Sequence, residues 1–126
     1  MKTIPEDLAR FVRESVDRLE TLDLLLLLQS SERGWSVQQL KAEMRSSEMS
    51  VELGLGILCA RGLVVKENDA YLFHPKSPVL EKMTLDLAAC YPERRAAVIE
   101  AIYSRSGEAV RGFADAFRIK KGGDNG

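Results

Sequence analysis

Apolar residues recur at intervals of three and four along most of the chain, which predicts a mainly helical protein. Pro5, Glu6 and Asp7 suit a first helical turn, because carboxylates favour the positive end of a helix. Helical spacing continues through an apolar set of five: Leu8, Phe11, Val12, Val16 and Leu19. The nearly all-leucine stretch 22–29 predicts a second helix that is buried on most sides.

Helix-capping residues divide the next part of the chain. The sequence Ser36-Val37-Gln38-Gln39 is a capping-box pattern and predicts a short helix that ends near Arg45. Its inward side chains are Val37, Leu40 and Met44. Ser46 and Ser47 then form a turn that caps a helix over 48–61, and Gly62 suits the left-handed residue that closes it.

Two runs of strand-forming residues follow, 63–65 and 71–73, with a polar stretch between them. They predict a β-hairpin with Asn68 and Asp69 at its tip.

The C-terminal third predicts three more helices. Ser77 and Pro78 begin one, with an apolar stripe of Val79, Leu80, Met83, Leu87 and Cys90. Pro92 begins the next, with Val98, Ile99, Ile102 and Tyr103 turned inward. A final helix from about Glu108 groups Val110, Phe113, Ala114 and Phe117 on one side.

The order helix, short helix, turn, helix and hairpin resembles the bacterial winged helix-turn-helix superfamily in its MarR-like style. The resemblance is carried by 36–44, by 47–61 and by the junction Arg61-Gly62-Leu63-Val64. Flanking segments are similar to those of uncharacterised bacterial winged-helix proteins: Ser15-Val16, the leucine run, Tyr91-Pro92-Glu93-Arg94 and 113–118. The resemblance implies a mainly α fold with a small β-hairpin, a winged helix-turn-helix with additional N- and C-terminal helices.

The same resemblance implies one domain over 1–121. Its winged-helix core would cover 21–75 and its C-terminal helices 78–119, with a flexible tail over 120–126.

In such proteins the helix matching 48–61 enters the major groove of DNA with polar and basic side chains. If Val51, Leu55 and Leu58 face the core, the opposite side of this helix is apolar. It carries Met49, Leu53, Gly56, Ile57 and Ala60. A helix that is apolar on both faces is normally buried on both. We therefore expect the C-terminal helices, a second copy of the chain or another protein to cover it, with Gly54 and Gly56 allowing a partner backbone to approach.

Charge favours the same interpretation. The segment 36–74 has four cations and five anions, and the whole chain has a net charge of −1. Neutralising phosphates needs the opposite balance. The sequence thus predicts a non-enzymatic, transcription-associated regulator that dimerises or binds another protein through Met49, Leu53, Gly56 and Ile57.

The alternative function is a DNA-binding transcriptional regulator. Its contacts to duplex DNA would come from eight residues in the short helix that ends near Arg45, helix 48–61 with its cap, the hairpin and the basic C-terminus: Lys41, Arg45, Ser47, Ser50, Lys66, Arg118, Lys120 and Lys121.

Other chemistry has little support in the sequence. His74 is the one histidine and lies outside any metal-ligand spacing, so no metal, cofactor or small-molecule ligand is expected. Cys59 and Cys90 form no CxxC motif, and a thiol switch would need a basic neighbour that the sequence does not indicate. The apolar run 24–28 is too short to cross a bilayer, so we expect a cytoplasmic protein without membrane contact.

Overall fold

A computed structural model describes residues 3–104, and these form a mainly helical fold with one small antiparallel hairpin. The elements are α1 (Glu6–Ser15), α2 (Leu19–Gln29), α3 (Val37–Met44), α4 (Glu48–Arg61), β1 (Val64–Glu67), β2 (Ala70–Phe73) and α5 (Pro78–Cys90). A further helical stretch covers 95–104. The predicted fold class is confirmed at this level, as a mainly α protein with a hairpin.

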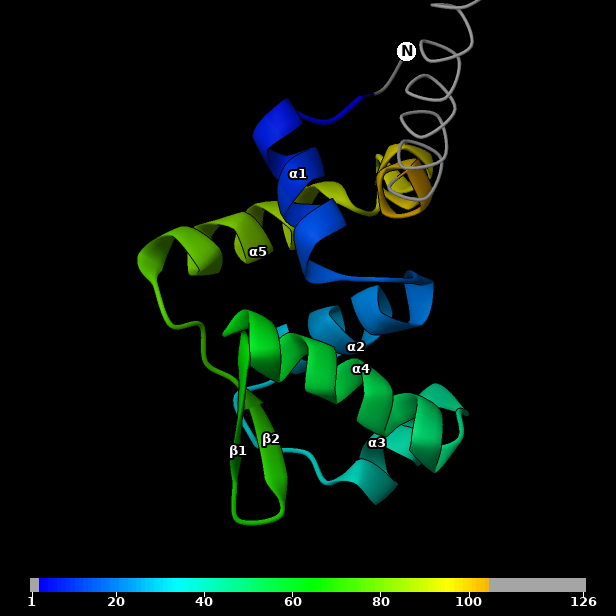
Figure 1. Cartoon of the computed structure of the whole chain (residues 1–126), viewed down its shortest axis with the longest axis vertical. Coiled ribbons are helices and arrows are strands. Elements are labelled where there is room, and N and C mark those ends of the chain that lie inside the picture. Colours follow the sequence, from blue (N-terminus) through cyan, green and yellow to red (C-terminus); the bar gives the residue numbers. More distant parts are fainter. Residues whose placement is uncertain (1–2, 105–126) are drawn as a thin grey trace, which may run out of the picture.

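The elements form two groups around α2 (Figure 1). In the lower group α4 packs on α2 and α3, and the hairpin extends from the C-terminal end of α4. In the upper group α1 packs on α5, which also contacts α2. Helix α2 therefore touches both groups, and its side chains connect them into one core.

The leucine run explains this central position. Leu22, Leu24, Leu25 and Leu28 are each at most 1% exposed, so α2 is buried on most sides, as its sequence predicts. The helix begins at Leu19, three residues before the predicted start. Val16 has an extended backbone that ends α1, so Leu19 belongs to α2 and not to the first helix. Helical spacing across this break misled the prediction, because both Val16 and Leu19 pack on the core.

The predicted caps are confirmed. The Ser36 hydroxyl accepts from the Gln39 amide at 3.1 Å, and the Gln39 side chain accepts from the Ser36 amide at 3.0 Å. Ser47 caps α4, and Gly62 closes it in the left-handed region at φ +84°. Ser77 caps α5, with Pro78 in its first turn.

The hairpin also follows the sequence. Val64 pairs with Phe73 and Glu67 with Ala70, which leaves Asn68 and Asp69 at the tip. Asn68 has φ +57°, a conformation that asparagine tolerates better than most residues. A bridge that the sequence did not indicate adds Trp35 beside β2: its amide and carbonyl both bond to Tyr71, at 2.9 and 2.7 Å.

The C-terminal helices differ from the prediction in detail. Val79 is 68% exposed, and the buried side chains of α5 are Leu80, Thr84 and Leu87. The last helical stretch begins at 95, because 91–94 form turns, and Tyr103 is 52% exposed rather than inward. The predicted helix from Glu108 and the predicted tail 120–126 lie outside the described residues.

Helices α2 and α4 approach closely at Gly54. An added Cβ there would lie 3.0 Å from Leu24 Cδ2, whereas a Cβ at Gly56 would meet nothing within 4 Å. The expectation that Gly54 serves an outside partner is therefore wrong, because α2 already occupies that approach. Gly56 stays open. Within 3–104, no helix is long and apolar enough to cross a membrane.

The two glycines provide a matched test of this packing. We expect Gly54→Leu to destabilise the fold by about 1–3 kcal/mol, because the side chain overpacks the contact with Leu24. Gly56→Leu should instead stabilise it by about 0.5–1 kcal/mol, because glycine is unfavourable inside a helix. Urea unfolding of both variants measures the difference. Equal effects would contradict the assigned faces of α4.

Candidate protein-interaction surface

The two faces of α4 differ in burial. Val51, Gly54, Leu55 and Leu58 face the core and are buried, as the sequence predicts for the three larger residues. On the opposite side four small or apolar residues form a line that we call the outer stripe: Met49, Leu53, Gly56 and Ala60. Met49 is 72% exposed and Leu53 is 55% exposed. Both lie on the same face because four residues make slightly more than one helical turn.

Nothing in 3–104 covers this stripe. The elements that pack closely on α4 are α1, α2, α3 and β1, and they all contact its other sides. The C-terminal helical stretch 95–104 lies in the upper group, away from α4 (Figure 1). We expected the second face of α4 to be covered, and no described residue covers it. Among the described residues the stripe is thus an exposed apolar surface.

Ile57 differs from the other three predicted interaction residues in burial. It is half-buried, whereas Met49, Leu53 and Gly56 are exposed. The structure brings Met49, Leu53 and Gly56 together on the surface and leaves Ile57 at the edge of that surface.

Acidic side chains border the outer stripe. Glu48 and Glu52 are exposed on α4, and Glu48 accepts a hydrogen bond from Gln38 of α3 at 3.2 Å. A hollow beside Glu52 is lined by α3, β1 and β2, with Lys66 and Asp69 among its residues. An apolar surface with this border matches a protein partner better than it matches a phosphate backbone.

The structure describes five of the eight residues of the DNA-binding alternative. Ser50 is engaged inside the chain, and the Ser47 hydroxyl accepts from the Ser50 amide at 3.1 Å as the cap of α4. Lys41 is half-buried, Arg45 is exposed at the end of α3 with φ +53°, and Lys66 lies 5.7 Å from the Tyr71 ring. The other three, Arg118, Lys120 and Lys121, lie outside the described residues.

A polar cluster that sequence reasoning missed joins the start of α2 to the turn before α4. The Glu20 carboxylate accepts hydrogen bonds from the hydroxyls of Ser46 and Ser50, the latter at 2.6 Å. Arg18 donates to the Ser50 carbonyl at 3.3 Å. The bonds from Ser46 and then Ser50 lower the pKa of Glu20 below its ordinary value, since they favour the ionised form.

Arg61, the last residue of α4, turns away from the outer stripe. Its guanidinium donates to the Ser15 hydroxyl at 3.0 Å and to the Glu14 carboxylate at 3.3 Å. The one cation inside α4 thus connects α4 to α1 and is not presented to an outside ligand. No sequence signal marks this contact, because its partners lie 46 and 47 residues away.

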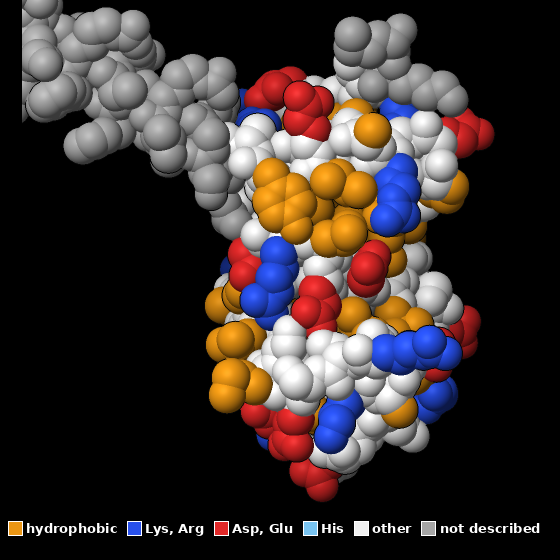
Figure 2. Space-filling view, turned by 90° about the vertical axis from the view of Figure 1, so that its right-hand side faces the viewer, with side chains coloured by type: hydrophobic (Ala, Val, Ile, Leu, Met, Phe, Trp, Pro, Cys, Tyr) orange, Lys and Arg blue, Asp and Glu red, His pale blue; other side chains and the backbone are white. Residues whose placement is uncertain are grey.

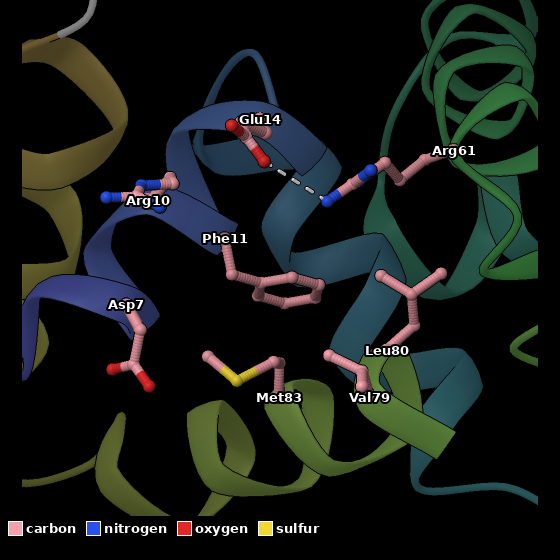
Figure 3. Close-up of a pocket in the computed structure, with 8 residues that line it drawn as sticks. All are labelled: Asp7, Arg10, Phe11, Glu14, Arg61, Val79, Leu80 and Met83. Carbon is pink, nitrogen blue, oxygen red and sulfur yellow. Dashed lines mark hydrogen bonds and ion pairs between the residues drawn. The ribbon is translucent and has the colours of Figure 1, made fainter. Parts of the chain in front are cut away.

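A hollow of about 220 Å³ lies beside this contact, between α1 and α5 (Figure 3). Phe11 from α1 and Met83 from α5 face each other across it, and the Arg61–Glu14 pair closes one side. The pair lies at the surface, with the Arg61 and Glu14 side chains 32% and 54% exposed, and it joins α4 to α1. The hollow is smaller than common small-molecule pockets, which begin at about 300 Å³.

The surroundings of the two cysteines reduce their reactivity. Burial raises the pKa of the Cys59 thiol and that of the Cys90 thiol, so both hold their protons more firmly than a free cysteine. Neither is in a disulfide. His74 is exposed after β2, and residues 3–104 hold no group of three metal-ligating side chains.

Charged side chains of both signs alternate on the face that Figure 2 shows. Lys and Arg side chains stand singly among Asp and Glu side chains, with apolar groups between them. Among the described residues of this face there is no broad basic surface.

Comparisons with protein-family models, with curated proteins and with solved structures find no match to this chain.

Glu20→Gln tests the polar cluster. A lowered pKa in the folded state means that ionised Glu20 stabilises the fold above pH 4.5, and this contribution is lost as pH falls through the folded value. We expect the variant to lose about 1–2 kcal/mol at pH 7, because a hydrogen bond to a charged group is worth about that much. The gap to the wild type should narrow as pH falls below 4.5. Denaturant unfolding across this pH range measures it, with the exposed Glu43→Gln as control.

Duplex DNA provides a second test of the surface. We expect the full chain to give no change in the anisotropy of labelled mixed-sequence duplex at about 50 mM salt, because binding at low salt requires clustered cations. Salt-sensitive binding that Arg45→Glu abolishes would contradict this expectation and favour the alternative function.

Proposed function

We propose that this protein is a winged helix-turn-helix protein that acts without catalysis, as a transcription-associated regulator working through protein contacts. The order α2, α3, α4 and hairpin supports the fold assignment, with α3 and α4 as the helix-turn-helix and the hairpin as the wing. The bridge between Trp35 and Tyr71 supports it further, since it attaches the wing to the segment before α3.

One observation carries the functional proposal. The face of α4 that would contact bases in a DNA-binding member is an exposed apolar stripe, with Met49 72% and Leu53 55% exposed. Methionine and leucine offer no donors to base edges, and Glu48 and Glu52 repel phosphates. Burying these apolar side chains against another protein is favourable, so the proposed partner is a protein.

A second copy of the chain is the partner that we propose. In an antiparallel pair of α4 helices, a two-fold axis midway between Leu53 and Gly56 would set Leu53 against Gly56 of the other copy and Met49 against its Ala60. Large side chains then meet small ones at both ends of the contact, as knobs meet holes in helix pairs. The proposal places this dimer in the cytoplasm, where the two thiols would stay reduced.

Leu53→Lys tests the proposal, with Leu85→Lys as its control because Leu85 is similarly exposed on α5, at 45%. We expect Leu53→Lys to raise the dimer dissociation constant at least about tenfold, which corresponds to about 1.4 kcal/mol. Thermal stability should change little, since the side chain is exposed. Sedimentation velocity at several concentrations measures association. If both variants associate like the wild type, the α4 surface is not the interface.

A further inference from the structure

The outer stripe and the C-terminal segment of the same chain have complementary surfaces. Val110, Phe113 and Phe117 are spaced by three and four residues, the spacing of one helical face. Around them are Arg111, Arg118, Lys120 and Lys121, with Asp115 as the only anion in 110–121. The stripe is apolar and bordered by Glu48 and Glu52. An apolar and basic segment therefore matches it in both hydrophobicity and charge.

The described chain ends beside the start of α2. The Leu19 amide donates to the Tyr103 hydroxyl at 3.2 Å, so the last helical turns lie beside the start of α2. From there Arg18 reaches Ser50, next to Met49 at the first end of the stripe. Residues 105–109 can extend the chain by at most about 17 Å before Val110. The segment thus starts within about 17 Å of the described end of the chain, beside the start of α2.

The stripe has space for a large side chain at its centre. Gly56 lacks a Cβ, and the position a Cβ would take has no neighbour within 4 Å. An aromatic ring placed there would contact Leu53 on one side and the backbone of α4 beneath it. Phe113 and Phe117 are the aromatic residues that the segment offers.

We propose that residues 110–121 dock on the outer stripe of their own chain and compete there with a second copy. The inference rests on the proposed function, because it assigns a regulator to the same surface. A short linker holds the tethered segment at an effective concentration of about millimolar, so docking within one chain is favoured over docking between chains. Dimerisation then requires displacement of the segment.

Disulfide trapping in the full chain tests the docking. In a Cys59→Ala, Cys90→Ala background, we expect the pair Leu53→Cys and Phe117→Cys to oxidise within one chain. The rate should exceed that of the control pair Leu85→Cys and Phe117→Cys at least about tenfold, because docking raises the local thiol concentration. Equal rates would overturn the proposal. Crosslinks that form only between chains would also overturn it, and would leave the proposed dimer standing.

A second measurement uses the native cysteines, in case the trapping background does not fold. Hydrogen peroxide oxidises exposed methionine, and at a protein concentration where the chain is monomeric we expect Phe117→Asp to raise the rate at Met49 by about threefold while Met83 stays unchanged. The same variant should strengthen dimerisation, the opposite of Leu53→Lys. An unchanged Met49 rate overturns the docking. If the Phe117→Asp chain stays monomeric while Met49 oxidises faster, the result contradicts the proposed dimer and leaves the docking standing.

Discussion

The contact between α2 and α4 at Gly54 is the packing on which the rest of the molecule depends. Leu24 lies so close to α4 that only a glycine fits without displacement. The contact fixes the rotation of α4 about its axis, with Val51, Leu55 and Leu58 turned to the core. With that rotation, Met49 and Leu53 face outward. The exposed stripe is thus a direct result of how the leucine helix packs.

Polar contacts hold the two ends of α4 in that orientation. Glu20 bonds to the turn that precedes α4, and Arg61 bonds to the last residues of α1. Each contact uses a polar residue of α4 or of its turn that would otherwise be free for a ligand. The serine and arginine that suit DNA contacts by residue type are occupied in building the fold.

Much of the fold could be predicted from the sequence, because its signals are local. The capping box at Ser36, the glycine at 62 and the Ser77–Pro78 start each act within one helical turn, and each is confirmed. Errors arose where distant packing decides. The break at Val16 and the outward Val79 depend on which neighbours cover the helix, and residue spacing does not carry that information.

The candidate surface likewise has features that could be predicted from the sequence and features that could not. Exposure of Met49, Leu53 and Gly56 on a common face follows from helical geometry, and the sequence located it. The internal use of Gly54 and the capture of Ser50 by Glu20 both depend on α2. Their cause is long-range, so a single sequence holds no signal for them.

The small sheet carries a consequence for how copies of this chain can meet. An open strand edge attracts other strands, and proteins limit this by shortening or charging the edge. Here each strand has four residues. Lys66 and Glu67 are charged residues of β1, and the Trp35 bridge occupies part of the edge of β2. Growth by strand addition, which leads to open-ended fibres, is therefore disfavoured. Association through helical surfaces, as in the proposed dimer, is not limited in this way.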